Sequence, residues 1–157
     1  MGIELNKRLE ATVGYLSLGL FHDAWNELES LPLDLQANES VIELRVEILL
    51  KLERWKFARV LAESQSKRFP ENPDWSTHWA FALRREKSIQ EARGVLWEAV
   101  QRHPACALIQ YNLACYAAVL GEHDEARRRL ATAFALDDGL RPIAMDDPDL
   151  EAIFGGV

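Results

Sequence analysis

A period of 34 residues runs through most of this 157-residue sequence. Alanine recurs four times at this spacing, and a large side chain precedes each alanine by three residues. Because no insertion interrupts the three intervals, the sequence indicates a tandem array of one structural unit. The alanines are Ala24, Ala58, Ala92 and Ala126, and the large side chains before them are Phe21, Trp55, Ile89 and His123.

Each period contains two apolar patterns with helical spacing, and the fourth period shows them best. Apolar side chains recur at three- and four-residue steps over 113–120, and Gly121 then ends the pattern as a left-handed cap would. A second amphipathic stretch follows over 122–136, with Ala126 and Leu130 on its apolar face. Small side chains at the alanine positions allow two helices to approach closely, so each period predicts a helix pair.

We therefore expect four helix pairs. Pro73 and Pro104 fall near expected helix starts, where the missing N–H of proline costs no hydrogen bond. The expected pairs are 4–18 with 22–31, 38–51 with 55–68, 74–86 with 88–102, and 105–120 with 122–136.

On these residues the chain resembles the tetratricopeptide repeat (TPR) family over roughly residues 5 to 138. The second and third periods match less closely than the fourth, and the first matches least, through Gly19 and Ala24. The resemblance implies an all-α fold, an αα superhelix (a TPR solenoid) with one concave and one convex face. The fourth period carries the resemblance through Tyr111-Asn112-Leu113-Ala114, Gly121, Asp124-Glu125-Ala126, Ala133 and Leu136-Asp137.

We expect the whole chain, 1–157, to form a single TPR domain. The repeats then divide at about 5–38, 39–72, 73–106 and 107–140. Asp147 is a suitable N-cap and Pro148 a suitable first helical residue, so a short C-terminal capping helix is predicted over 146–154. Such a cap covers the apolar flank that a terminal repeat would otherwise expose. Residues 155–157 are predicted to be a flexible tail.

Charge and composition exclude several classes of protein. The 18 Lys and Arg against 25 Asp and Glu give a net charge of -7, which argues against a nucleic-acid partner. No run approaches the ~20 apolar residues of a membrane helix, so no membrane association is expected. The two cysteines, Cys106 and Cys115, are too few for a disulfide framework, and this fits a reducing compartment. We expect a cytoplasmic protein.

The sequence contains no motif that would support catalysis. It lacks GxGxxG, P-loop, HExxH and GxSxG patterns. His103 and Cys106 lie three residues apart, but zinc needs more ligands than these two, and only Cys115 lies nearby in sequence. We therefore expect no catalytic residues, no metal site and no cofactor, and we do not expect an enzyme.

In TPR proteins the first helix of each pair lines the concave groove, where peptides or partner helices bind. Carried over to this chain, the resemblance implies a groove that is acidic in the second pair and aromatic with a cation in the third. Phe81 and Tyr111 are side chains of the kind enriched at binding hot spots, and Arg84 suits a bidentate pair with a carboxylate. The candidate peptide-binding residues are Glu43, Glu47, Thr77, Phe81, Arg84, Tyr111 and Cys115.

One residue departs from the repeat pattern. Arg45 falls where the repeat usually places a packing leucine. Either its stem extends past the core so that the charge reaches a polar environment, or the second pair is rotated relative to the family consensus.

Two functional hypotheses follow. The first is a non-catalytic protein–protein interaction module, a scaffold or adaptor that binds an extended peptide or helix in its concave groove. The alternative is a self-associating structural TPR unit that forms homo-oligomers, because the atypical first repeat is a surface that another copy would cover. In both, the partner is another protein or peptide.

Overall fold

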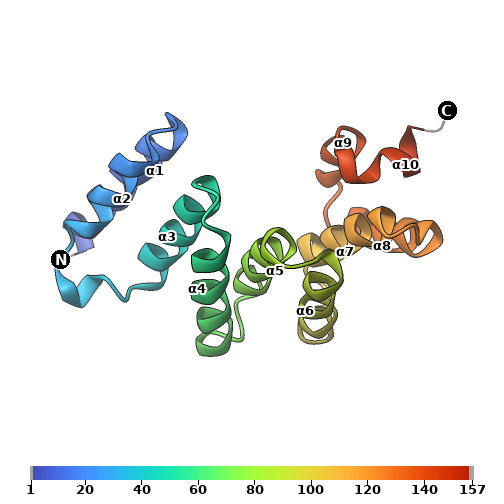
Figure 1. Cartoon of the computed structure of the whole chain (residues 1–157), viewed down its shortest axis with the longest axis horizontal. Coiled ribbons are helices and arrows are strands. Elements are labelled where there is room, and N and C mark those ends of the chain that lie inside the picture. The colour runs from blue at the N-terminus through green and yellow to red at the C-terminus, as the bar shows by residue number, and fades with distance from the viewer. Residues whose placement is uncertain (1, 156–157) are drawn as a thin grey trace.

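The computed structural model describes residues 2–155, and these residues form only helices and connecting segments, with no strand. The helix pairs follow one another along the long axis of the molecule, from α1 and α2 in blue to α7 and α8 in orange, and α9 and α10 in red lie beside the last pair (Figure 1). The all-α superhelix of helix pairs expected from the sequence is therefore confirmed. Residues 156–157 of the predicted flexible tail lie outside the described residues.

The eight helices of the four pairs begin and end within two residues of their expected ranges. The turns therefore fall where the apolar periodicity stops. The pairs are α1 (Gly2–Ser17) with α2 (Phe21–Glu29), α3 (Glu39–Lys51) with α4 (Trp55–Arg68), α5 (Asp74–Glu86) with α6 (Ile89–Arg102), and α7 (Ala107–Val119) with α8 (His123–Leu136).

The repeated alanine lies in the second helix of each pair, where it is completely buried. Ala24, Ala58, Ala92 and Ala126 each have 0% of their surface exposed. A methyl group is the largest substituent that allows two helix backbones to approach at such a position without displacing neighbouring side chains. The 34-residue column therefore has a packing cause.

A second column of the repeat forms the turn within the first, second and fourth pairs. Gly19, Glu53 and Gly121 have φ values of 75°, 56° and 81°, in the left-handed region. The following amide closes the helix end in each case: Leu20 N donates to Tyr15 O at 2.9 Å, and Glu122 N donates to Ala117 O at 2.8 Å. This is the Schellman arrangement, and glycine is the residue that adopts it without strain. The second pair has a glutamate there instead.

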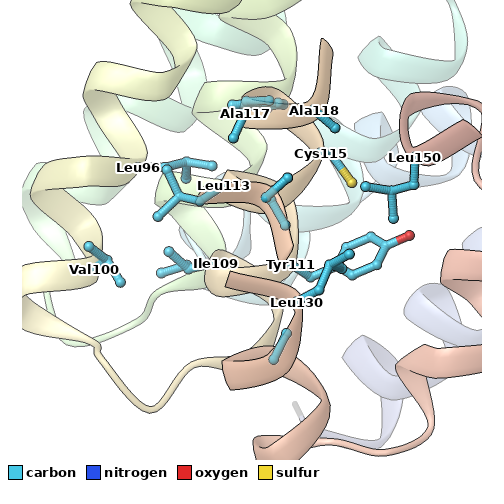
Figure 2. Packing of buried hydrophobic residues seen from close by; sticks show 14 of the residues in the cluster. Leu96, Val100, Ile109, Tyr111, Leu113, Cys115, Ala117, Ala118, Leu130 and Leu150 are labelled. Atoms are coloured by element: carbon cyan, nitrogen blue, oxygen red, sulfur yellow. The ribbon is translucent and has the colours of Figure 1, made fainter. Parts of the chain in front are cut away.

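The apolar interior is divided into three clusters. The amino-terminal cluster joins the first pair to α3, the central cluster joins the second pair to α5, and the carboxyl-terminal cluster joins the third and fourth pairs to the end of the chain. The amino-terminal cluster contains Ala24, Leu28, Leu31, Val41 and Ile48. The central cluster contains Ile42, Val46, Ala58, Ala62, Trp75 and Ala82. The carboxyl-terminal cluster is the largest, and Figure 2 shows part of it, including Leu96, Ile109, Leu113, Leu130 and Leu150.

Arg45 connects the first pair to the second. Its guanidinium donates to Glu29 at 2.7 Å and to Gln36, and lies 4.7 Å from the centre of the Trp25 ring. Gln36 in turn donates to Leu31 O at 2.8 Å, in the connection that contains the 3₁₀ turn η1 (Leu33–Leu35). The side chain is nearly buried while its charge reaches polar partners, as the first of the two alternatives for Arg45 requires.

The carboxyl end differs in detail from the expectation of one helix over 146–154. A helix that the sequence analysis missed, α9 (Leu140–Met145), comes first, followed by the 3₁₀ turn η2 (Pro148–Leu150) and the short helix α10 (Glu151–Phe154). The Asp147 carboxylate accepts from Asp149 N at 3.0 Å, which caps η2 as expected of an N-cap aspartate. The cap is thus split into separate short elements.

We predict that Glu53→Gly raises the free energy of unfolding by about 0.5–1 kcal/mol, because it removes a side chain from the left-handed region. Lys87→Gly is the matched control: it lies one period later, but φ there is -122°, so glycine relieves no strain. Urea denaturation followed by circular dichroism measures both variants. Equal effects of the two substitutions would contradict this account of the turn.

Candidate functional site

The first helices of the pairs are neighbours in the stack, since α1 contacts α3 and α5 contacts α7. The predicted binding residues come from α3, α5 and α7. We call the surface that these residues occupy the first-helix surface. Its two halves differ: the half on α3 and the start of α5 carries acidic groups without partners, and the half on α7 and the end of α5 is covered by the chain's own carboxyl-terminal segment.

Glu43 and Glu47 lie one turn apart on α3 and are partly buried. Burial raises the pKa of both carboxyls, and the nearby carboxylates of Asp74 and Glu39 raise the pKa of Glu43 further. Within residues 2–155 neither side chain forms an ion pair or a side-chain hydrogen bond. The two glutamates therefore form a negative surface that lacks direct compensation.

His78 of α5 faces this acidic pair. Burial lowers the pKa of its imidazole, although the charge of Glu47 acts in the opposite direction. Its Nδ1 atom is buried and has no hydrogen-bond partner among the described residues. The charges of His78 and Lys51 lower the pKa of Glu47, but burial outweighs both effects.

Glu39, one turn before Glu43, shows the opposite behaviour. The Oε1 atom of Glu39 accepts hydrogen bonds from Asn72 Nδ2 and Trp75 Nε1, each at 2.8 Å. These bonds lower the pKa of the Glu39 carboxyl. Sequence reasoning missed this group, because its donors lie a full repeat away and no local pattern connects them. Glu39 ties α3 to α5, and Glu43 and Glu47 remain available to a ligand.

Phe81 provides an exposed aromatic ring near the middle of the first-helix surface. It is 44% exposed, and its ring centre lies 6.2 Å from that of Trp55. The Arg85 guanidinium lies 5.6 Å from the Trp55 ring centre and 5.9 Å from that of Phe81. Thr77, one turn before Phe81, donates its hydroxyl to Pro73 O at 3.3 Å, so its polar group is already used within the helix.

The carboxyl-terminal half of the surface is occupied by residues 147–150. Arg84 makes two hydrogen bonds to Asp149, Nη1 to Oδ2 at 2.7 Å and Nη2 to Oδ1 at 2.9 Å. The Tyr111 hydroxyl donates to Asp147 Oδ2 at 2.6 Å, and Cys115 Sγ donates to the same oxygen at 3.6 Å. Figure 2 shows Tyr111 and Cys115 on α7, with Leu150 beside them.

The tyrosine and cysteine side chains under this segment are neutral at ordinary pH. Burial is the main cause that raises the pKa of the Tyr111 phenol and of the Cys115 thiol, and the Asp147 carboxylate adds to both effects. Burial also raises the pKa of Tyr116 to about 12. A thiol held protonated beside carboxylates is a poor nucleophile, so this arrangement does not indicate covalent catalysis.

Cys115, Asp147 and Asp149 also meet the spacing of a metal site, because their potential ligand atoms lie within 4.8 Å of one another. However, Asp149 is already paired with Arg84, and Asp147 accepts from Tyr111. A cation would compete with the guanidinium and would require the thiolate that the site disfavours. The group is better explained as an anchor for the carboxyl-terminal segment.

The seven candidate residues therefore separate into two sets. Glu43, Glu47, Thr77 and Phe81 belong to the uncovered half of the first-helix surface. Arg84, Tyr111 and Cys115 belong to the covered half, and the last two are 5% and 3% exposed. Tyr111 and Cys115 were predicted to line an open groove. In the structure they do not, because the end of the chain folds back over them.

Comparison with known proteins identifies the fold only. No protein-family model and no curated protein sequence matches the chain. The solved structure "MamA RS-1 ArsTM double mutant" is similar, with a TM-score of 0.66 and 16% identity over 85% of this chain and 75% of that chain. The structures "MamA MSR-1 C2" and "MamA AMB-1 C2221" have TM-scores of 0.63 and 0.61, each with 20% identity. They cover 84% and 83% of this chain, and this chain covers 76% of each.

None of the helices in residues 2–155 is both long enough and apolar enough to cross a membrane.

We predict that Glu47→Gln stabilises the protein at pH 7 by about 0.2–0.5 kcal/mol, because burial and the charge of Glu43 disfavour the Glu47 carboxylate more than His78 and Lys51 favour it. A carboxyl whose pKa is raised in the folded state makes the protein less stable as the pH rises above the ordinary carboxyl pKa of 4.5. The stability gain from Glu47→Gln should therefore appear above pH 4.5 and vanish at pH 3.5. Urea denaturation at both pH values measures it. The control is Glu10→Gln on the exposed side of α1, and a gain at pH 3.5 as large as at pH 7 would contradict the prediction.

Proposed function

We propose that this chain is a non-catalytic interaction module that binds an extended peptide or a helix on the first-helix surface. The site consists of Glu43 and Glu47 on α3 with Thr77 and Phe81 on α5. The TPR resemblance supports a concave groove at these positions, with repeats at about 5–38, 39–72, 73–106 and 107–140. The fold shared with the MamA structures is compatible with that arrangement.

The observation that carries the proposal is the partly buried pair Glu43 and Glu47, neither of which forms an ion pair or a side-chain hydrogen bond within residues 2–155. Burial of a charged carboxylate destabilises the free protein, and this is the main cause of the raised pKa of both groups; neighbouring carboxylates add to it. A positively charged ligand would remove the repulsion and gain charge-assisted hydrogen bonds. We therefore infer that the binding partner presents Lys or Arg side chains to α3.

Phe81 defines the second feature of the partner. Its exposed ring, packed near Trp55, is a preformed apolar contact that pays little conformational entropy on binding. The partner segment thus combines a basic side chain with an apolar one. No step in this function requires a catalytic residue, a metal or a cofactor.

We predict that labelled nonapeptides containing two lysines and one leucine or phenylalanine bind the protein, whereas the same peptides with glutamate in place of lysine do not. Fluorescence anisotropy of arrays that vary the residue positions measures the affinity. Glu43→Gln/Glu47→Gln and Phe81→Ala should each weaken the best peptide at least about tenfold, equivalent to 1.4 kcal/mol.

Two matched variants control this experiment. Glu10→Gln removes an acidic charge from the exposed side of α1, and Phe57→Ala removes an exposed ring from α4. Neither residue belongs to the proposed site, so both variants should bind as the parent does. Binding that survives the Glu43/Glu47 and Phe81 changes would remove the proposal.

Self-association is the alternative. Apolar side chains are exposed at both ends of the stack: Ile3 and Leu18 are 76% and 74% exposed, and Ile143 and Met145 are 57% and 62% exposed. A second copy that covers such ends would extend the array. On this alternative, light scattering over a hundredfold dilution series shows a mass that falls toward the 17.9 kDa of the monomer. A constant monomer mass excludes it.

A further inference from the structure

Residues 147–150 occupy part of the first-helix surface, although they belong to no helix pair. Their contacts involve Arg84, Tyr111 and Cys115, three side chains that the repeat pattern assigns to ligand binding. The partners are far apart in sequence: 65 residues separate Arg84 from Asp149, and 36 separate Tyr111 from Asp147. The chain thus brings an acidic segment back to the surface where a ligand would lie.

The contacts distinguish individual positions of this segment. The first aspartate accepts from a tyrosine hydroxyl, the second receives a bidentate guanidinium, and Leu150 is fully buried one residue later. Pro148 between the aspartates is exposed and serves only the turn. The covered half of the first-helix surface therefore recognises the pattern Asp-x-Asp-Leu, through two carboxylates and one apolar side chain.

One of the polar anchors is accessible to water. The Arg84 and Asp149 side chains are 27% and 26% exposed, so water reaches both members of the pair and competes for their charges. Of the residues after Leu150, Ile153 and Phe154 of α10 are only partly buried. Leu150 is the one fully buried apolar side chain of residues 147–150, so it is the main apolar contact that displacement of these residues breaks.

We infer that the half of the first-helix surface formed by Arg84, Tyr111 and Cys115 binds an acidic peptide segment of the pattern Asp-x-Asp-Leu in a partner protein, which displaces residues 147–150. This inference rests on the proposed function, because it takes the first-helix surface as the binding site. It adds a second specificity: the uncovered half selects basic side chains, and the covered half selects acidic ones. Residues 147–150 then compete with the partner peptide for the covered half, so the partner must bind tightly enough to displace them.

A competition experiment on the full chain tests this inference. The probe is a fluorescein-labelled nonapeptide with the sequence of residues 146–154, Asp-Asp-Pro-Asp-Leu-Glu-Ala-Ile-Phe. In the Asp147→Asn/Asp149→Asn variant the resident segment loses its charges, while asparagine still caps the turn. We expect the peptide to bind this variant at least tenfold more tightly than it binds the parent chain.

Variants of neighbouring arginines provide the control. Arg84→Gln, added to the Asp147→Asn/Asp149→Asn background, should reduce peptide affinity at least tenfold. Arg85→Gln on the same background should leave it unchanged, because Arg85 lies over Trp55 and Phe81 and does not contact residues 147–150. If the peptide does not bind the double variant, or if Arg84→Gln has no effect, the inference is wrong.

Hydrogen exchange on the parent chain covers the case in which the double variant does not fold. The Leu150 amide bonds to Asp147 O at 3.0 Å, and local opening should let it exchange on the order of a hundredfold faster than the Cys115 amide of α7. Exchange of both amides at one common rate would show that the segment never opens alone, and would overturn the inference. Failure of the proposed function is separate, because it appears as loss of lysine-peptide binding, which this experiment does not use.

Discussion

Close contact between helices at one alanine per repeat holds this molecule together. The four alanines have no exposed surface, so the second helix of each pair is packed closely against its neighbours at this position. That contact fixes the direction of the second helix against the first, and the left-handed turn at Gly19, Glu53 and Gly121 joins the two with little freedom. Once pairs of one geometry are stacked, their first helices must lie side by side. The surface on which both proposals depend follows from this packing.

Electrostatics divides that surface. On α3, Glu39 is satisfied by two donors, whereas Glu43 and Glu47 are not, and the directions of their pKa shifts express the difference. At the end of α5, Arg84 has found its carboxylate within the same chain. The uncovered half therefore has carboxylates without an ion-pair partner among the described residues. In the covered half, Arg84 is already paired with a carboxylate of the same chain. The two halves call for opposite ligand chemistry.

The regular part of the fold could be predicted because every period repeats the same local problem. Three features predict the same helix boundaries: the alanine column, the glycine turns and the apolar spacing. Because they agree, the predicted helix ends lie within two residues of the observed ones. The carboxyl end has no such column. Helix α9 and the turn η2 follow the last period, and nothing local links Asp149 to Arg84. For the same reason the sequence did not indicate that the returning segment covers Tyr111 and Cys115.

The three separate apolar clusters determine how the array responds to heat. The carboxyl-terminal cluster spans two pairs and the returning segment, whereas the amino-terminal cluster holds one pair against a single further helix. Neighbour-to-neighbour contacts of this kind break in sequence rather than all at once. Thermal unfolding should thus begin at α1 and α2 and proceed along the stack, and the fourth pair should unfold last. A shortened but ordered array is a natural intermediate of this chain.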